Sequence, residues 1–552
     1  MNRDTIIGGL CLAAAFGLWI YQSQHQEEVP AKVVVKHVES IPGTPVAAPT
    51  LLQKKVEAPV IQATVVDKAE LYVLENDAIR VTFTNRGGGI QSVAFKKYAD
   101  RKDTTDPYVF NARNDVPALS LSLSDAGKEV DFSPLYKLVK QSSDSILFEY
   151  ISPEGLKLLR GYKLSALNAE KESEPYLIDH ETRFINHTPS AQSLSRVYLN
   201  LGWFPATPGD NYGEYLNFTY YNGKTDKIVK IKDFKASNGF FGIGRSPGKD
   251  REEQSVPNLE WGSVKNQFFA TLMTPNVAST GFFARPKWIG ADEGITASLS
   301  FDLGELTTEK ILGLQFYVGP KEYTRLDMLG KKQDLIMQFG FFGFISRILV
   351  VIMNAIHGVL NNWGWTIIVL TLFVKLLLWP LTAAQVNSSK RMALIQKPLQ
   401  TLREKYKGNP QKLQTETMKL FKENKVNPAA GCLPLLIQLP IFLGFYYMLR
   451  STAEFRFAPF LWISDLSIPD TLFHVAGFPF NPLPLVMGVT MFLQMQMTPS
   501  PTMDSTQKRI FQFMPAFFLF ICYNFPSGLV LYWTVQNLLT ILQQLLTNRK
   551  KA

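Results

Sequence analysis

The pattern of apolar and polar positions changes abruptly near residue 335. Before this point, residues 79–84 (IRVTFT) and 312–318 (LGLQFYV) alternate apolar and polar side chains, which is the period of a half-buried β-strand. Glycines at 87–89 follow the first of these strands and permit the positive backbone angle of a tight turn. Residues 67–330 are therefore predicted to form a large, mostly antiparallel β-sandwich.

Long apolar runs follow residue 335, and they predict a polytopic α-helical membrane protein. Five of these runs are expected to span the bilayer: 363–381, 431–449, 484–498, 510–524 and 526–546. A further apolar segment at 6–21 is interpreted as an uncleaved signal anchor, because no small-x-small cleavage motif follows it. A cleaved signal peptide and a lipoprotein signal are the alternatives. With the anchor, six transmembrane helices are expected.

Charge is unevenly distributed along the chain, whose formal net charge is +10. Residues 382–430 carry ten basic and three acidic residues, and residues 508–509 and 549–551 add positive charge. Basic loops beside membrane spans mark the cytoplasmic side. We therefore expect a membrane protein with both termini cytoplasmic and the β-sandwich on the opposite side of the membrane. Nucleic-acid recognition is not expected, because the positive charge lies between apolar spans.

The apolar run at 335–360 is long enough to span the bilayer. If it did, every later loop would change sides, and the basic cluster would face outward. We therefore predict an amphipathic helix that lies in the membrane interface on the side away from the cytoplasm. The expected order of the chain is an anchor at 1–21, a flexible linker at 22–66, the β-sandwich at 67–330, the interfacial helix at 331–362, a membrane core at 363–546 with a cytoplasmic hairpin at 383–428, and a basic tail at 547–552.

The predicted cytoplasmic hairpin consists of two helices. Gly408 ends the first helix, and Pro410 suits the first turn of the second. Apolar residues of the two helices are expected to meet across the hairpin: Leu399, Leu402, Tyr406, Leu413, Leu420 and Phe421. Its basic residues form a predicted contact surface: Lys390, Arg391, Lys397, Arg403, Lys405 and Lys407.

Lys375 is the most informative polar residue within a predicted span, because a charge at the bilayer centre costs about 2.5–3.5 kcal/mol on insertion scales. Such a residue is expected to face a wet cavity. Lys375 also lies only about 9 Å from the cytoplasmic end of its span, so its flexible stem can instead reach the headgroups. Thr371 lies four residues earlier on the same helical face and favours a polar stripe. Both interpretations stay open.

Other polar residues recur within the predicted spans. They are Gln438, Gln494, Gln496, Gln512, Asn524, Thr534, Gln536 and Asn537. Their number suits a water-filled groove, and contacts between neighbouring helices are the alternative.

No catalytic, cofactor or metal site is predicted. The segment GFFGIGRSPG at 239–248 approaches both a phosphate-binding loop and a nucleophile elbow. However, Arg245 stands where the loop needs lysine, and Pro247 lacks the N–H that the elbow needs, so we interpret the segment as a surface turn. The three cysteines lie in apolar runs, and no Cys or His cluster has metal-ligand spacing.

Three segments resemble the signature spans of YidC insertases, which are related to the Oxa and Albino families. The segment NPAAGCLPLLIQLPIF at 427–442 resembles their third span, NWGWTIIVLTLFVKLLLWPLTAAQ at 362–385 their second, and PSGLVLYWTVQNLLTILQQ at 526–544 their last. The resemblance implies a five-helix core with a hydrophilic groove, and a β-supersandwich on the periplasmic side of the bacterial inner membrane. The resemblance implies a groove charge at Lys375 and a groove aromatic residue at either Tyr532 or Trp533. The polar residues Thr371, Gln438 and Gln512 complete the predicted groove.

The resemblance implies a membrane protein insertase and chaperone, which is not an enzyme and needs no cofactor. Expected partners are nascent membrane proteins, Sec translocon subunits, membrane lipids and, through the basic hairpin, the ribosome. The family's groove charge is usually arginine, whereas this chain has Lys375, which keeps the charge but loses the bidentate fork. A small-molecule transporter predicts internal repeats, and none is evident. An anchored periplasmic carbohydrate-binding protein or enzyme predicts paired carboxylates and leaves five spans unexplained.

Overall fold

The computed structural model describes residues 69–549, except 102–103, 126–127, 165–173, 195, 209, 211–212, 237–245, 384–390, 392–393, 425–432 and 498–504. The predicted anchor at 6–21 and linker at 22–66 lie outside the described residues, as does most of the basic tail.

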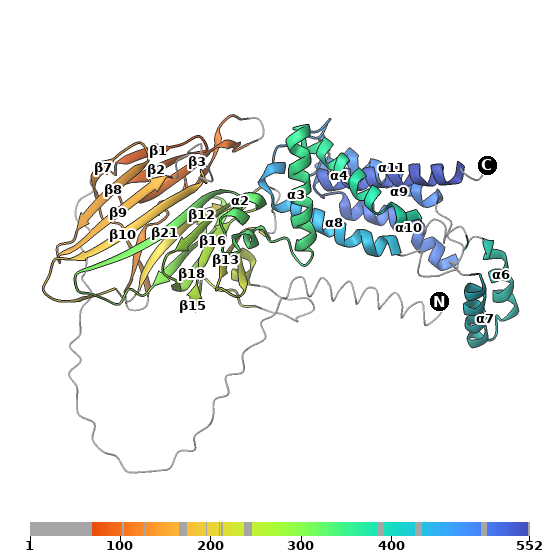
Figure 1. The fold of residues 1–552 in the computed structure, drawn as a ribbon, viewed down its shortest axis with the longest axis horizontal. Helices are drawn as coiled ribbons and strands as arrows, with labels where there is room; N and C mark the ends of the chain where they lie inside the picture. Colours follow the sequence, from red (N-terminus) through yellow and green to blue (C-terminus); the bar gives the residue numbers. More distant parts are fainter. Residues whose placement is uncertain are drawn as a thin grey trace, which may run out of the picture. The chain divides into compact units, whose positions relative to one another are not determined.

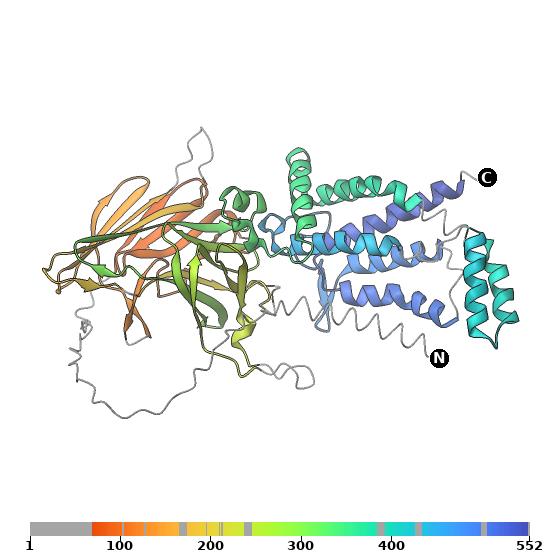
Figure 2. The same ribbon diagram turned by 60° about the horizontal axis from the view of Figure 1, so that its bottom comes forward.

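Strands from Leu71 to Pro320 form three main sheets, and their neighbouring strands pair antiparallel (Figures 1 and 2). The nine-stranded sheet has the order β14 (Asp226–Lys230), β13 (Asn217–Tyr221), β16 (Trp261–Lys265), β17 (Phe269–Pro275), β21 (Glu309–Pro320), β10 (Leu177–Asn186), β9 (Leu156–Leu164), β8 (Ser145–Ile151) and β7 (Lys137–Gln141). The six-stranded sheet has the order β15 (Glu252–Leu259), β18 (Ser279–Ile289), β19 (Asp292–Phe301), β12 (Val197–Pro205), β5 (Leu121–Asp125) and β6 (Lys128–Phe132). The four-stranded sheet consists of β1 (Leu71–Glu75), β2 (Ile79–Thr84), β3 (Gly89–Ala99) and β4 (Pro107–Phe110).

The nine- and six-stranded sheets pack against each other, because β12 contacts β16 and β17, and β19 contacts β13 and β16. Their shared core includes Trp261, Phe218 and Leu299, all fully buried. Gly262 lies between them, and a Cβ atom there would come within 2.7 Å of a Leu299 methyl group. The predicted large antiparallel β-rich domain is therefore confirmed.

The two strands predicted from sequence bury their apolar positions, with one departure from the alternation. In β2, Ile79, Val81 and Phe83 are fully buried, and the turn that follows has positive φ at Gly87 and Gly88. In β21 the alternation fails at Tyr317, which is also fully buried. Its hydroxyl donates a hydrogen bond to the Pro320 carbonyl over 2.6 Å, so the end of this strand is covered on both faces.

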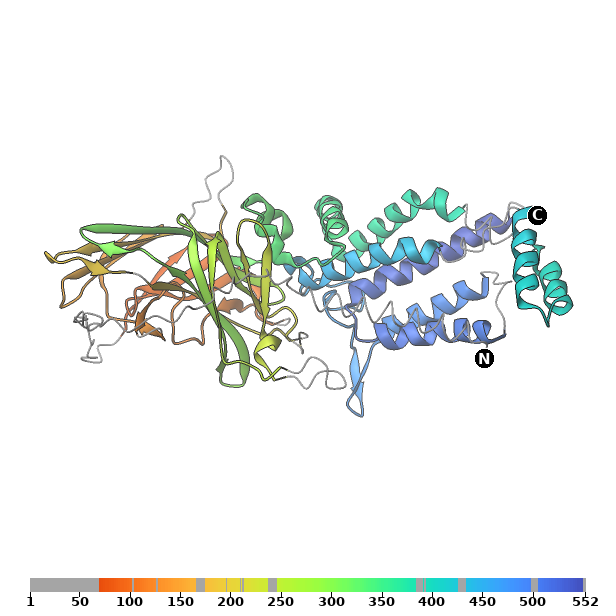
Figure 3. The same ribbon diagram turned by 90° about the horizontal axis from the view of Figure 1, so that it is seen from below.

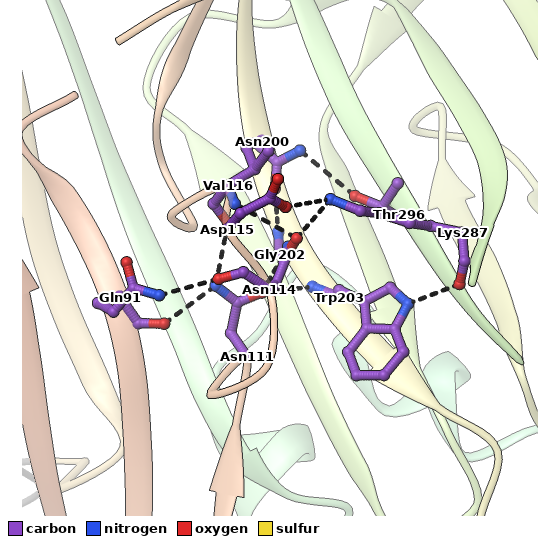
Figure 4. Close-up of polar contacts among 10 residues, drawn as sticks. All are labelled: Gln91, Asn111, Asn114, Asp115, Val116, Asn200, Gly202, Trp203, Lys287 and Thr296. Carbon is purple, nitrogen blue, oxygen red and sulfur yellow. Dashed lines mark hydrogen bonds and ion pairs between the residues drawn. The ribbon is translucent and has the colours of Figure 1, made fainter. Parts of the chain in front are cut away.

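A buried polar network fixes the loop after β4 to the four-stranded and six-stranded sheets (Figure 4). Asn111 has a left-handed backbone (φ 59°), and its side chain donates to the Gln91 carbonyl and accepts from the Trp203 amide. Lys287 on β18 donates from Nζ to Asn114 Oδ1 over 2.6 Å. Because each of these amides is bonded within the fold, the network holds the loop in place against the neighbouring strands.

Helices follow Pro320 and make up most of the remaining chain. They are α2 (Tyr323–Met328), α3 (Gly343–Leu360), α4 (Trp363–Leu377), α6 (Gln396–Lys405), α7 (Pro410–Glu423), α8 (Leu433–Ser451), α9 (Pro482–Met497), α10 (Ser505–Cys522) and α11 (Ser527–Arg549), with 3-10 turns η2 (Gln333–Met337) and η4 (Ala453–Phe455). Each of the five runs expected to span corresponds to one of α4 and α8–α11, which lie side by side in Figure 3. By length and composition, two described helices are long and apolar enough to cross a membrane, Gly343–Leu360 and Ser527–Leu546. The count of six spans stays a prediction.

The apolar run at 335–360 is not one helix, as its length suggested. It begins with η2, and α3 starts only at Gly343. Gln338 and Gly340 both have positive φ (54° and 67°), a backbone conformation that interrupts a right-handed helix. Figures 1 and 2 show α3 lying crosswise to α8 and α11, and the Ser346 hydroxyl donates to the Gly444 carbonyl on α8 over 2.8 Å.

The predicted hairpin of helices is present as α6 and α7. Pro410 occupies the first turn of α7, and Asn409 caps it by accepting a hydrogen bond from the Lys412 amide over 3.1 Å. The buried contact between the helices consists of Ile395, Leu399 and Phe421, with Leu420 against it. Ile395 was not selected from sequence, whereas Leu402, Tyr406 and Leu413 are only partly buried.

A polar stripe on α11 as the candidate functional site

Lys375, in the last turn of α4, is 3% exposed. Its Nζ atom donates a hydrogen bond to Oγ1 of Thr540 on α11 over 2.8 Å. The Thr540 hydroxyl in turn donates to the Gln536 carbonyl, one turn earlier on α11, over 2.7 Å. The ammonium group therefore points toward α11 and is held by a neutral hydroxyl.

Thr371 lies on the same face of α4 as Lys375 and is fully buried. Its hydroxyl donates to the Ile367 carbonyl over 2.6 Å, within its own helix. This bond uses the hydroxyl proton locally, so Thr371 adds a polar atom to the face but is not bonded to Lys375.

A second polar contact joins α8 to α11. Gln438 donates from Nε2 to the Tyr532 hydroxyl, and Gln536 donates from Nε2 to Gln438 Oε1 over 3.4 Å. Tyr532 is 1% exposed, and its ring packs against Phe445 on α8 with centroids 4.8 Å apart. The Gln536 Oε1 atom is buried and accepts no hydrogen bond from any described residue.

Tyr532, Gln536 and Thr540 are spaced four residues apart, so they form one stripe along α11. The stripe meets Gln438 of α8 at one end and Lys375 of α4 at the other. It also holds unused hydrogen-bonding capacity, because a lysine ammonium has three donors and Gln536 keeps a free acceptor. A polar ligand that enters between these helices would find both donors and acceptors.

The remaining predicted groove residues lie apart from the stripe. Trp533 is partly buried between Phe442 on α8 and Phe518 on α10, with ring centroids 4.6 and 4.9 Å away. Gln512 on α10 is exposed and belongs to neither polar contact. Of the two aromatic residues considered from sequence, Tyr532 is therefore the one in the polar stripe.

Sequence reasoning placed Gln536 among the polar residues that suit a groove but did not select it as a site residue, and it did not consider Thr540. Their spacing from Tyr532 was a usable signal, because polar residues at i, i+4 and i+8 share one helical face. Two further contacts along α11 were also missed: Asn537 donates to Thr490 on α9 over 3.2 Å, and Gln543 donates to Thr382 over 3.0 Å. Such pairs hold neighbouring helices together, which is the alternative function of polar residues within spans.

The basic surface of the hairpin is solvent-facing where it is described. Arg391, Lys397, Lys405 and Lys407 are exposed, and Arg403 is partly buried. Lys390 lies outside the described residues. The exposed positions project positive charge without covering the small apolar contact between α6 and α7.

A cavity of about 490 Å³ opens on the nine-stranded sheet of the β-rich domain. Asp179 and Glu181 project from alternate positions of β10 into its lining, and they form a carboxylate pair of the kind that the carbohydrate alternative predicts. Glu181, however, is bonded to Arg183 of the same strand over 2.5 Å, and Asp179 accepts from Gln315 over 3.4 Å. The pair is thus already engaged within the sheet.

The segment that resembles catalytic motifs lies largely outside the described residues, at 237–245. Its described part, 246–248, is not helical, Ser246 is exposed, and Gly248 has φ 75°. Both motifs require a helix at this point, whereas the next element is β15. Among the described residues, no group of three His, Cys, Asp or Glu is arranged to hold a metal ion.

Comparisons with known proteins give a consistent result across the chain. A model of the YidC periplasmic domain matches residues 71–352, and a model of the 60Kd inner membrane protein family matches residues 355–552. The membrane protein insertase YidC of Endomicrobium trichonymphae is 31% identical over 502 residues, which cover 88% of this chain and 86% of that relative. The chain belongs to the YidC family.

A second YidC insertase, from Syntrophobacter fumaroxidans, is 40% identical over 389 residues, which cover 68% of this chain and 67% of the relative. Among solved structures, an active YidC insertase with its first transmembrane domain resolved covers 87% of this chain and 93% of its own, at 20% identity and a TM-score of 0.35. The YidC periplasmic domain model extends from β1 into α3, and the model for the helical part begins within α3. The family inferred from three motifs is therefore confirmed.

Proposed function

We propose that this chain is a membrane protein insertase and chaperone. It moves hydrophobic segments of newly made proteins from the cytoplasm into the inner membrane, alone or with the Sec translocon. The observation that supports this most directly is the polar stripe of Tyr532, Gln536 and Thr540 on α11, which meets Gln438 on α8 and Lys375 on α4. The relatives, which are named membrane protein insertases, support the same function.

In the proposed topology, the segment at 6–21, α4 and α8–α11 are the six spans, and both termini are cytoplasmic. The helix α3 lies in the outer interface, and its crosswise orientation relative to α8 and α11 supports this placement (Figure 1). The domain limits are those expected from sequence, with the β-supersandwich at 67–330 in the periplasm and the insertase core at 363–546. The basic residues at 382–430 then face the cytoplasm.

The proposed mechanism needs no covalent chemistry. A client segment with a short polar flank enters between the helices from the cytoplasmic side. The Lys375 ammonium, the free Gln536 acceptor and water replace the hydrogen bonds that the flank loses when it leaves bulk water. The client's apolar helix then leaves sideways, because its side chains are more stable in lipid than in water.

Lys375 sets the expected client preference. An ammonium is a compact point charge, so it stabilises a client carboxylate without the two parallel bonds that an arginine would form. The exposed cations of the hairpin, such as Lys397 and Lys405, are the proposed contact for the ribosome or for anionic lipid headgroups.

Reconstitution tests this function directly. The purified chain, in liposomes without other proteins, should insert a small two-span client so that its translocated loop becomes protected from added protease. Liposomes that carry the Lys375→Glu variant at the same density are the matched control. Equal protection in empty liposomes, or with an inert membrane protein of similar size, would contradict the proposal.

A further inference from the structure

A small β-hairpin precedes α9. Its strands, β22 (Phe473–Val475) and β23 (Phe478–Phe480), pair antiparallel across a two-residue turn. Both turn residues, Ala476 and Gly477, have positive φ (49° and 83°), as in the tight turns that suit the twist of paired strands. The hairpin thus has a defined geometry, although an isolated pair of strands is only marginally stable in water.

One face of the hairpin is entirely apolar. Phe473 pairs with Phe480 and Val475 pairs with Phe478, so these four side chains lie on the same face. The rings of Phe473 and Phe480 stack with centroids 4.8 Å apart. Even so, Phe473, Val475 and Phe478 are 52%, 59% and 67% exposed, respectively. A cluster of this kind, left open at a hairpin tip, indicates a contact that the described residues do not supply.

The base of the hairpin, in contrast, is fixed by hydrogen bonds. Asn481 donates to the Tyr523 carbonyl over 2.8 Å and accepts from the Thr471 hydroxyl over 2.7 Å. The Tyr523 hydroxyl donates to the Pro479 carbonyl over 2.7 Å, and the Leu472 amide donates to the Phe480 carbonyl over 3.0 Å. The hairpin is therefore held in place at the end of α10, and its tip projects from a stable base.

The hairpin is continuous with a stretch of the chain that lacks acidic residues, lysine and arginine. No Asp, Glu, Lys or Arg occurs from residue 471 through residue 503, which includes the whole of α9. Only Asn481 separates β23 from α9, and α9 has 16 residues. A helix of this length rises about 24 Å, against a hydrocarbon core of about 30 Å. If α9 spans the bilayer, the hairpin at its outer end lies at or within the boundary between headgroups and acyl chains.

The hairpin also extends sideways. Figure 3 shows it, in blue, projecting crosswise to the helices at the end where α9 begins. Large apolar side chains on the neighbouring helices are open as well, including Val489 on α9 (59% exposed) and Phe517 on α10 (58%). A water-exposed surface that binds a protein partner has a polar rim, whereas the chain from the hairpin through α9 has no Asp, Glu, Lys or Arg to form one.

We propose that the β22–β23 hairpin is a lipid-binding element, whose apolar face inserts into the outer leaflet beside α9 and α10. It would act like an interfacial anchor, with Phe473, Val475 and Phe478 among the upper parts of the acyl chains. The ligand is the lipid surface itself, without selectivity for a headgroup charge, because the hairpin has no Asp, Glu, Lys or Arg. This inference rests on the proposed placement of α9 and α10 in the bilayer.

Site-directed fluorescence in vesicles tests the insertion. The full chain, with Cys11, Cys432 and Cys522 replaced by serine, receives one cysteine for an environment-sensitive fluorophore, as Phe478→Cys or Val475→Cys. Vesicles of phosphatidylethanolamine and phosphatidylglycerol carry a nitroxide either near the top of the acyl chain or near its end. The label at either position should be quenched more by the shallow nitroxide than by the deep one, and little by aqueous iodide.

Two matched positions separate the possible outcomes. Val277→Cys, at a 56% exposed turn of the β-rich domain, should respond to iodide and not to lipid nitroxide. Phe517→Cys on α10 should respond to lipid nitroxide. If the hairpin label responds to iodide, as the label at position 277 does, while the label at position 517 is quenched by lipid nitroxide, the hairpin proposal is overturned and the membrane placement of α10 stands. Iodide access at Phe517 overturns the membrane placement. If the hairpin label is protected from iodide only when each vesicle holds more than one chain, a second copy of the protein covers the hairpin, and the proposal is also overturned.

Discussion

The Nζ atom of Lys375 on α4 lies 2.8 Å from Oγ1 of Thr540 on α11, and it donates a hydrogen bond to that hydroxyl. Among the described residues, no carboxylate forms an ion pair with this ammonium. A buried charge that is held only by a neutral hydroxyl keeps most of its electrostatic capacity for another group. In the proposed mechanism, that group is the polar or acidic flank of a client.

Charge at position 375 should determine insertion of clients with acidic flanks. Lys375→Arg should retain activity, whereas Lys375→Ala and Lys375→Glu should lower it. A hydrogen bond to a charged group contributes about 1.5–3 kcal/mol, so a decrease in insertion rate of about 10- to 150-fold is expected for Lys375→Ala. The measurement is protease protection of a client in liposomes, compared between acidic and neutral flanks.

Thr540→Val is the matched control for Lys375, because it removes the hydroxyl that accepts from Nζ but leaves the charge. This variant should insert acidic clients nearly as well as the parent chain. Full activity of Lys375→Glu would contradict the proposed role of the charge and favour a side chain that only reaches toward the headgroups.

The Tyr532 hydroxyl should matter more than the neighbouring Trp533 ring. Tyr532→Phe keeps the contact with Phe445 but leaves the Gln438 amide without its acceptor. An unsatisfied buried donor costs about 1–3 kcal/mol, so both thermal stability in detergent and insertion should decrease. Trp533→Phe keeps an aromatic ring between α8 and α10 and should change insertion less. The opposite order of effects would remove Tyr532 from the site.

Sequence periodicity predicted the elements of this fold better than it predicted their contacts. The alternation over 79–84 and 312–318 located β2 and β21, and the apolar runs located α4 and α8–α11. Apolar length alone gave the wrong start for α3, because it does not register the positive φ at Gln338 and Gly340. The contact between Lys375 and Thr540 was missed for a different reason: the two residues lie on helices that are far apart in sequence, so only the packing of α4 against α11 brings them together.

Glu454 should make the stability of the chain depend on pH. It lies in η4, where one carboxylate oxygen is buried without a hydrogen-bond partner among the described residues. Burial, and then the charge of Glu322, raise the pKa of Glu454 to about 8. The folded state therefore holds a proton that the unfolded state releases near its ordinary pKa of 4.5. Stability is greatest below that value and is lost as pH rises toward 8.

The variant Glu454→Gln has no titratable group at position 454. It should therefore weaken the dependence of stability on pH and raise the melting temperature at pH 8. Thermal unfolding in detergent at several pH values measures the effect. Glu305→Gln is a suitable control, because Glu305 is exposed in the short strand β20 (Glu305–Leu306) and should not alter the pH profile. An unchanged slope for Glu454→Gln would show that other groups cause the pH dependence.

Reporter fusions should place the segments before and after α4 on opposite sides of the membrane. A reporter joined after residue 425 is expected to be cytoplasmic, because residues 382–430 carry ten basic and three acidic residues. A reporter at residue 300, in β19, is expected to be periplasmic. Activity of both reporters on one side would contradict the six-span topology and would require α3 to cross the bilayer.

The β-rich domain should be separable from insertion, although its removal should lower stability. The net charge of the domain is small. The domain also precedes α3 in the chain, whereas the polar stripe lies on α11 and meets α4 and α8. The domain nevertheless contacts the loop after α8, where Arg456 donates to the carbonyl of Asp100 over 2.7 Å. Deletion of residues 67–310 breaks this contact and leaves α3 and the helices that follow intact.

Insertion of the two-span client by this deletion variant should stay close to that of the parent, while its melting temperature decreases. Arg456→Ala in the full chain separates the two effects, because it removes the guanidinium contact with Asp100 and retains the whole domain. This substitution should lower stability without lowering insertion at a temperature where both proteins are folded. If a stable, membrane-localised deletion variant inserts no client, the domain takes part in insertion itself, and the polar stripe on α11 is then insufficient without it.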